Sequence, residues 1–224
     1  PFVVAMPGAA LTAGLFGYLI GKPTLRLSGI YMTLATLGFN IIYNVTEIIN
    51  FGQGEFVMLG GLVMVFFRVA LQIPLVFSLP LTIMVVTAAG ILLDRLAIRP
   101  IRKPSVLAMV IATIGAAFFI KGAAMFIWGK NPFDLPPFSS RHPIAFLGAV
   151  IQPQGLWVMG FLVVVVIGLT IFFDRTMIGK ALRACAVNAN ASSLVGINVK
   201  QMILASFALS AAIGALGGVV ITPI

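Results

Sequence analysis

The sequence predicts an all-α fold, a polytopic transmembrane helix bundle of about six to seven spans at roughly 20 residues per span. Two observations lead to this class. Hydrophobic residues make up 61% of the 224 residues and charged residues only 8%, whereas soluble domains contain about 25% charged residues. A soluble fold of this length could not bury so much apolar surface. The apolar residues also form separate runs of about the length that crosses a bilayer.

Seven such runs follow one another along the chain, and each one is bounded by helix-breaking or charged residues. Pro23 follows the first run, Pro74 follows the third, and Asp94 begins a basic segment after the fourth. The last run carries small residues every fourth position, which predicts a close helix-packing face; these are Ser206, Ser210, Gly214 and Gly218. The seven runs cover about residues 2–20, 27–45, 56–71, 75–93, 106–128, 156–173 and 202–221.

The basic residues predict the orientation of these runs. Eight of the fourteen Lys and Arg residues lie in two short segments, 94–103 and 174–200. Basic loops stay on the cytoplasmic side, so we expect both segments there. The Pro-rich connection 129–155 carries few charges and is expected outside. A net charge of +9 that is distributed in this way indicates a protein in contact with a lipid bilayer and not with nucleic acid.

The first run does not fit this orientation. If every run spans, Lys22 and Arg26 lie outside, where basic residues are disfavoured. The two later loops carry the stronger signal, so they decide the assignment. The chain also begins without Met in the middle of apolar sequence, which we interpret as a fragment boundary.

Segment 179–198, GKALRACAVNANASSLVGIN, is rich in small residues that favour a compact helix. Thr176 is a plausible N-cap, and Gly196 stands where a helix would end in a left-handed turn. A short helix on the basic side offers a surface to a soluble partner. The alternative interpretation is an ordinary cytoplasmic loop.

Polar residues interrupt the apolar sequence at 47–55, EIINFGQGE. Asn50, Gln53 and Glu55 are expected to line a substrate pathway, because polar groups among apolar spans usually face a cavity or a partner. The two glycines beside Gln53 predict a helix break near the bundle centre. Lys121 is the expected ion-pair partner of Glu55. The alternative places this segment at the wetted membrane surface, where Glu55 would only cap the next helix.

The sequence carries no enzyme-like constellation. His142 is the only His and Cys185 the only Cys, so neither a metal cluster nor a Cys/His couple is expected. The phosphate-binding pattern GxxxxGK[ST] is missing, so any ATP hydrolysis is expected on a separate chain. We therefore expect a transporter subunit without a cofactor, and not an enzyme.

Three stretches resemble the permease subunits of branched-chain amino acid ABC importers of the LivH type, over about residues 29–224. The first is GIYMTLATLGFNIIYNVTEIINFGQGEFVMLGG at 29–61. The second is DRLAIRPIRKP at 94–104, followed by IATIG at 111–115, and the third is segment 179–198. Residues 1–28, with PTLRL near their end, are more similar to the partner permease of LivM type.

The resemblance implies a single permease domain over 1–224, with residues 1–28 from a different context and the family's later spans missing. It implies a bacterial inner-membrane protein that works with two cytoplasmic ATP-binding subunits, a second permease subunit and an external solute-binding protein. Segment 179–198 would contact the ATPase; the residues expected to carry this coupling are Gly179, Arg183, Ala184, Gly196 and Asn198.

The function implied is inward movement of branched-chain or related amino acids by alternating access, driven by ATP. Two departures from the family pattern stand at functional positions: Gln53 replaces the usual His, and Val187-Asn188 replaces an acidic pair. Two alternatives remain open. One is an importer permease of the same family for a urea-like amide or a sugar, and the other is a secondary transporter that needs no ATPase.

Overall fold

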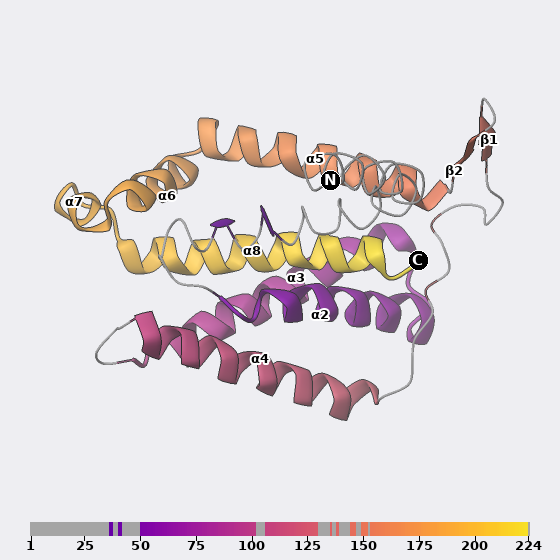
Figure 1. Ribbon diagram of the computed structural model, residues 1–224, viewed down its shortest axis with the longest axis horizontal. Coiled ribbons are helices and arrows are strands. Elements are labelled where there is room, and N and C mark those ends of the chain that lie inside the picture. The colour runs from indigo at the N-terminus through magenta and orange to yellow at the C-terminus, as the bar shows by residue number, and fades with distance from the viewer. Residues whose placement is uncertain are drawn as a thin grey trace, which may run out of the picture.

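The computed structural model describes residues 36–37, 40–41, 50–101, 106–129, 135, 138, 144–146, 149–151 and 153–223. Helices dominate the described part of the chain (Figure 1). The helices are α2 (Gln53–Val65), α3 (Leu75–Leu93), α4 (Val106–Trp128), α5 (Pro153–Arg175), α6 (Met177–Val187), α7 (Ala189–Leu194) and α8 (Val199–Ile221), with the π-helical turns η1 (Phe66–Ala70) and η2 (Asp94–Ile98).

Five helical segments of the described part are long and apolar enough to cross a membrane. They are Gln53–Ala70, Leu75–Ile98, Leu107–Trp128, Leu156–Arg175 and Val199–Ile221. The predicted all-α polytopic class is confirmed, and α3 and α4 have the predicted bounds. The runs at 2–20 and 27–45 fall largely or wholly outside the described residues, so the total of six to seven spans stays a prediction, as do the roles expected for residues 1–28.

Helix α8 forms the centre of the bundle. Figure 1 shows it between α5 on one side and α2 with α3 on the other. Of its spanning window 61% is buried, against 11% for each of the α4 and α5 windows. The helix-packing face predicted from the sequence makes this burial possible, because small residues let backbones approach closely. Around it a core cluster contains Phe56, Val63, Val86, Leu93, Ile98, Phe207, Ala211 and Ala215.

The contact between α2 and α8 depends on glycines of both helices. A Cβ added to Gly214 would lie 2.9 Å from the Cβ of Phe56, and one added to Gly218 would overlap the carbonyl oxygen of Val57. On the α2 side, a Cβ on Gly60 would lie 2.7 Å from the Cα of Ala215. The two backbones therefore touch without intervening side chains.

The two ends of the bundle differ. At one end η2 meets the start of α8, where Arg99 Nη2 donates to the carbonyl oxygen of Lys200 at 3.5 Å. This contact places Arg99 and Lys200, one from each basic segment, at the same end of the bundle; the cytoplasmic location of both segments stays a prediction. At the opposite end, a short antiparallel hairpin pairs β1 (Ile144–Phe146) with β2 (Ala149–Ile151) (Figure 1). The connection 129–155, expected to be irregular, thus contains extended structure that its β-branched residues favour.

Candidate functional site

Helix α2 begins deep inside the bundle, within the polar stretch noted in the sequence. Its first residue, Gln53, contacts Ser210, which is the twelfth of the 23 residues of α8 counted from Val199. The N-cap residue Gly52 supplies no side-chain cap. Residues 50–52 are non-helical and α2 becomes helical beside the middle of α8. The break expected at Asn50–Glu55 stays a prediction, because residues 42–49 lie outside the described part of the chain.

Gln53 and Ser210 form a buried pair that locks α2 to α8. Gln53 is 6% exposed and Ser210 is fully buried. Gln53 Nε2 donates to the Ser210 carbonyl oxygen at 3.4 Å, and Ser210 Oγ donates back to Gln53 Oε1. The sequence indicated Ser210 as a packing residue only. Its role as hydrogen-bond partner needed the register between two helices that lie 157 residues apart in sequence.

Thr113 of α4 joins the same polar cluster. Its Oγ1 accepts a hydrogen bond from the Phe51 backbone N–H at 3.4 Å and donates to the Val110 carbonyl oxygen at 2.9 Å. The start of α2 is therefore held by α8 through Gln53, and Phe51 just before it is held by α4. This arrangement satisfies a backbone group just before α2 that has no intrahelical partner.

Asn50 is the exception among these polar side chains. It is 2% exposed, and its Oδ1 accepts a hydrogen bond from the Gly52 N–H at 3.0 Å. Its Nδ2 is buried and has no hydrogen-bond partner among the residues that the structure describes. A buried polar atom without a partner costs free energy, so such atoms are uncommon and call for an explanation.

Glu55 lies half-buried in the first turn of α2. A carboxylate at this position interacts favourably with the positive end of the helix dipole. The expected ion pair with Lys121 is wrong: Lys121 is exposed on α4, and the ion pairs of the described residues are Asp94–Arg99 and Asp174–Arg183. Sequence spacing does not define how α4 is rotated relative to α2, and that rotation decides which residues face each other.

At the end of the bundle that carries the basic segments, α6 and α7 protrude beyond the spans (Figure 1). The predicted N-cap of α6 is present, since Thr176 Oγ1 accepts a hydrogen bond from the Gly179 N–H at 3.0 Å. Gly179 also permits the elbow with α5, because an added Cβ would lie 2.7 Å from the Cα of Phe173. Gly196 has φ +89°, the left-handed conformation expected for it.

The segment forms two helices where the sequence predicted one. Asn188 separates α6 from α7 with an extended backbone of φ −160° and ψ 103°. Its Oδ1 accepts a hydrogen bond from the Ala191 N–H at 2.9 Å and thereby caps α7. Asn is a strong N-cap residue, and here its local hydrogen bond starts a new helix instead of allowing α6 to continue. Asn198 caps α8 in the same way, through the Gln201 N–H at 3.2 Å.

The Arg183 side chain bonds to the end of α5 and does not point toward a partner-binding surface. Its Nη2 donates to the Phe173 carbonyl oxygen at 2.8 Å, and its Nη1 lies 2.9 Å from Asp174 Oδ1. A cation at this place satisfies one of the last carbonyls of α5 and its dipole. Arg183 thus fixes the angle between α5 and α6. Ala184, also an expected coupling residue of α6, is half-buried.

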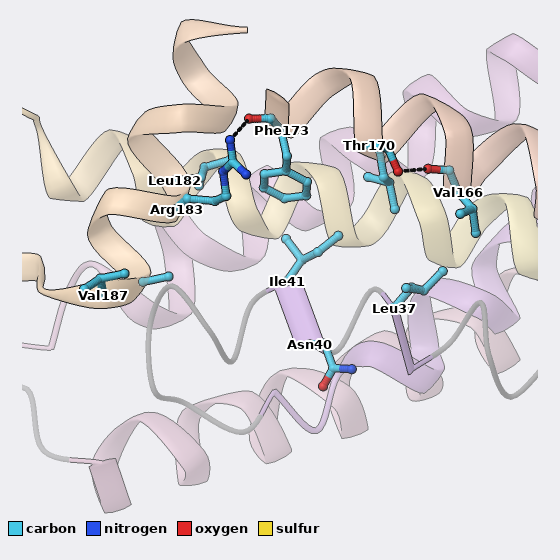
Figure 2. Close-up of a pocket in the computed structure, with 11 residues that line it drawn as sticks. Leu37, Asn40, Ile41, Val166, Thr170, Phe173, Leu182, Arg183 and Val187 are labelled. Atoms are coloured by element: carbon cyan, nitrogen blue, oxygen red, sulfur yellow. Dashed lines mark hydrogen bonds between the residues drawn. The ribbon is translucent and has the colours of Figure 1, made fainter. Parts of the chain in front are cut away.

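A pocket of about 570 Å³ lies in the corner between α5 and α6. Figure 2 shows Ile41 facing Phe173 across it, with Arg183 at one side. Its lining is mainly aliphatic and aromatic, and contains none of the three residues expected on the substrate pathway. It suits an apolar group, and the polar cluster around Asn50 is a separate site.

The outer surface of the α6–α7 segment carries exposed apolar side chains that the sequence analysis did not select. Val187 and Leu194 are each 88% exposed, and Val195 is 77% exposed. They lie at the two ends of α7, beyond the last spanning residue of α5. The available signal was that large aliphatic residues stand beside the small and polar ones of segment 179–198. We refer to these three residues as the apolar tip.

Comparison with known proteins places these features in a family. The profile described as "branched-chain amino acid transport system / permease component" matches residues 24–224. The chain is 28% identical over 200 residues to the high-affinity branched-chain amino acid transport system permease protein BraD of Pseudomonas aeruginosa. It is 29% identical over 202 residues to the corresponding permease protein LivH of Escherichia coli, and 26% identical over 205 residues to a probable LivH of Methanocaldococcus jannaschii.

These matches cover 84% of this chain and 65%, 65% and 61% of BraD and the two LivH proteins, respectively. The chain therefore spans somewhat less than two thirds of the length of these relatives. No solved structure matches it.

Proposed function

The chain belongs to the family of permease components of branched-chain amino acid transport systems, and we propose that it is a transmembrane permease subunit of an ATP-driven ABC importer. It moves branched-chain or related amino acids inward by alternating access, in a bacterial inner membrane. Its proposed partners are two cytoplasmic ATP-binding subunits, a second permease subunit and an external solute-binding protein. The ATP-binding subunits carry out hydrolysis, so this chain is not itself an enzyme.

The observation that carries this proposal is the apolar tip. Val187, Leu194 and Val195 are exposed on the short helices between the candidate spans Leu156–Arg175 and Val199–Ile221. An exposed apolar group on a protruding element is typical of a protein interface. An ATPase-coupled permease needs such a contact, whereas a secondary transporter does not.

The tip is joined rigidly to two spans. Arg183 and Gly179 fix α6 against the end of α5, and the Asn198 cap starts α8 directly after the Gly196 turn. Movement of a partner against the tip would therefore reach α8, the buried centre of the bundle. Because α8 holds the start of α2 through Gln53 and Ser210, the same movement would reach Asn50, Gln53 and Glu55.

We assign the pathway to this region. Helix α2 begins beside the middle of α8 and carries Glu55 in its first turn, and helix ends of this kind bind substrates in the discontinuous helices of other transporters. Glu55 would attract the ammonium group of an amino acid. A urea-like amide or a sugar as substrate, and an ATPase-independent secondary transporter, are the alternatives.

Co-purification tests the coupling. The full-length protein, expressed with its partners and extracted in mild detergent, should retain ATP-binding subunits and a second permease. Leu194→Ser and Val187→Ser should weaken that association, because they remove apolar contact area. Ala191→Ser, a small polar substitution on the same helix, is the matched control. Retention of normal ATPase association by both variants would exclude the tip as the docking surface.

Uptake tests the pathway. Glu55→Gln keeps the shape of the side chain and removes its charge, so amino acid uptake at matched expression should fall sharply. Met58→Leu, one turn further along α2, conserves volume and should leave uptake near the wild-type rate. Unchanged uptake in Glu55→Gln would leave Glu55 with only its helix-capping role.

A further inference from the structure

We propose that an exposed face of α4 binds the second permease subunit, and that Lys121 on this face pairs with a carboxylate in a spanning helix of that subunit. This inference rests on the proposed function, which includes a second permease. It goes further, because it locates the contact, gives its chemistry and identifies the partner as a different chain and not a second copy of this one.

Helix α4 lies at the edge of the bundle (Figure 1), and its main contacts in the described part are with α2 and η2. One side of it packs against the core cluster, for example through Ile120. The opposite side is exposed, and its residues are Ile111, Gly115, Phe118, Gly122 and Met125. Lys121 is exposed as well and stands at the margin of that side, about 100° round the helix from Ile120. We call these exposed residues, with Lys121, the outer face of α4.

Lys121 is the only charged residue within the candidate span Leu107–Trp128. It stands seven residues before Trp128 and fourteen after Leu107, which at 1.5 Å per residue is about 10 Å from one end of the span and about 21 Å from the other. The Cα–Cβ bonds of a helix tilt toward its N-terminus, so this side chain starts toward the middle of the span. Both the depth and the direction oppose snorkelling of the ammonium group to water at the nearer end.

Within the described part of the chain, Lys121 has no ion-pair partner. The two ion pairs found there are Asp94–Arg99 and Asp174–Arg183, and neither includes Lys121. An ionisable side chain inside a span almost always faces protein or a water-filled cavity and pairs there. The exposed position of Lys121 on the outer face therefore assigns its counter-charge to a neighbouring protein.

A second copy of this chain does not supply that counter-charge. In a two-fold contact between the outer faces of two copies, each Lys121 approaches the other, and like charges repel. Of the carboxylates in the candidate spans, Asp94 and Asp174 are bonded to arginines, and Glu55 is half-buried on α2. A different permease chain with Asp or Glu at this depth satisfies the charge. Its helix can approach closely at Gly122, beside which the described residues leave open space.

Co-purification of the second permease with the tagged full-length protein, in detergents of increasing strength, tests the contact. Lys121→Leu removes the ammonium group and leaves the partner's carboxylate unpaired, so the amount of second permease retained should fall about tenfold or more. Lys121→Arg keeps the positive charge and is the matched control, expected to retain the wild-type amount. Far-UV circular dichroism of each purified variant checks that the chain itself stays folded.

Photochemical labelling identifies what lies against the outer face. Cys185 is the only cysteine, so Gly122→Cys in a Cys185→Ser background gives a single thiol, which is labelled with benzophenone maleimide. Illumination of membranes that contain the whole complex should join this position to the second permease, and mass spectrometry identifies the joined chain.

Retention of the wild-type amount of second permease by Lys121→Leu would overturn the inference. A benzophenone product with lipid alone, or with a second copy of this chain, would overturn it as well. In each of these cases ATP-dependent amino acid uptake by the wild-type complex would leave the proposed function standing. Absence of any second permease from the wild-type complex would remove the partner on which both depend.

Discussion

Replacement of Gly218 by Ala tests whether close backbone contact between α2 and α8 holds the bundle together. A Cβ at this position would overlap the carbonyl oxygen of Val57 and lie 2.8 Å from the Gly61 nitrogen. Both are backbone atoms of α2, which cannot move aside as a side chain could. The two helices must therefore separate, and the neighbouring contacts of Phe56 and Ala215 must loosen with them.

The magnitude follows from two opposing terms. Overpacking in a well-packed core costs about 1–3 kcal/mol, and overlap with immobile backbone atoms of α2 places Gly218→Ala near 3 kcal/mol. Ala is more favourable than Gly inside a helix by about 1 kcal/mol. The net loss is about 2 kcal/mol, or roughly a 30-fold change in the ratio of folded to unfolded protein.

Gly160→Ala is the matched control on another span. Outside its chain neighbours and its own helix backbone, no atom of the described residues lies within 4 Å of an added Cβ at Gly160, so only the helix-propensity gain of about 1 kcal/mol acts there. Unfolding of each purified variant from mild detergent by added SDS, followed by far-UV circular dichroism, gives the free energies. A midpoint for Gly218→Ala equal to or above that of Gly160→Ala would refute the packing argument.

Three further predictions concern the α6–α7 segment. Gly196→Val should lower the free energy of unfolding by about 1–3 kcal/mol, because φ +89° strains a β-branched residue. It should also lower ATPase association more than Ala191→Ser does, and equal association of the two variants would contradict this. Arg183→Ala should loosen the α5–α6 elbow by about 1 kcal/mol, the scale of an exposed ion pair, measurable as faster hydrogen exchange in α6. Of single cysteines placed at Ser193 and Ser139, only the one at Ser139 should react with an impermeant reagent in intact cells. Reaction at Ser193 and not at Ser139 would contradict the predicted orientation.

Much of the helical architecture could be predicted from the sequence because membrane spans are governed by length and apolarity. The bounds of α3 and α4 follow from apolar runs ending at polar or breaking residues. The cap at Thr176 and the left-handed turn at Gly196 are equally local. Such features depend on residues a few positions apart, so no tertiary information is needed.

One local expectation, a single helix over segment 179–198, was wrong. Segment 179–198 is rich in helix-favouring alanines, yet Asn188 divides it, because its side chain bonds the Ala191 N–H. An Asn inside a helical pattern is compatible both with a continuous helix and with a cap that starts a new one. The packing of α6 against α5, with Arg183 bonded to Phe173 and Asp174, adds the contact that orients the first of the two helices.

The candidate site depended on tertiary structure. The sequence by itself determined that Asn50, Gln53 and Glu55 stand beside glycines between apolar runs, and that α8 carries a face of small residues. Only the assembled bundle decided that Gln53 meets Ser210, that Asn50 Nδ2 stays unpaired, and that Lys121 does not pair with Glu55. The physical reason is that these outcomes depend on the register and rotation of helices far apart in sequence. Those are set by how closely Gly60, Gly214 and Gly218 let the backbones approach.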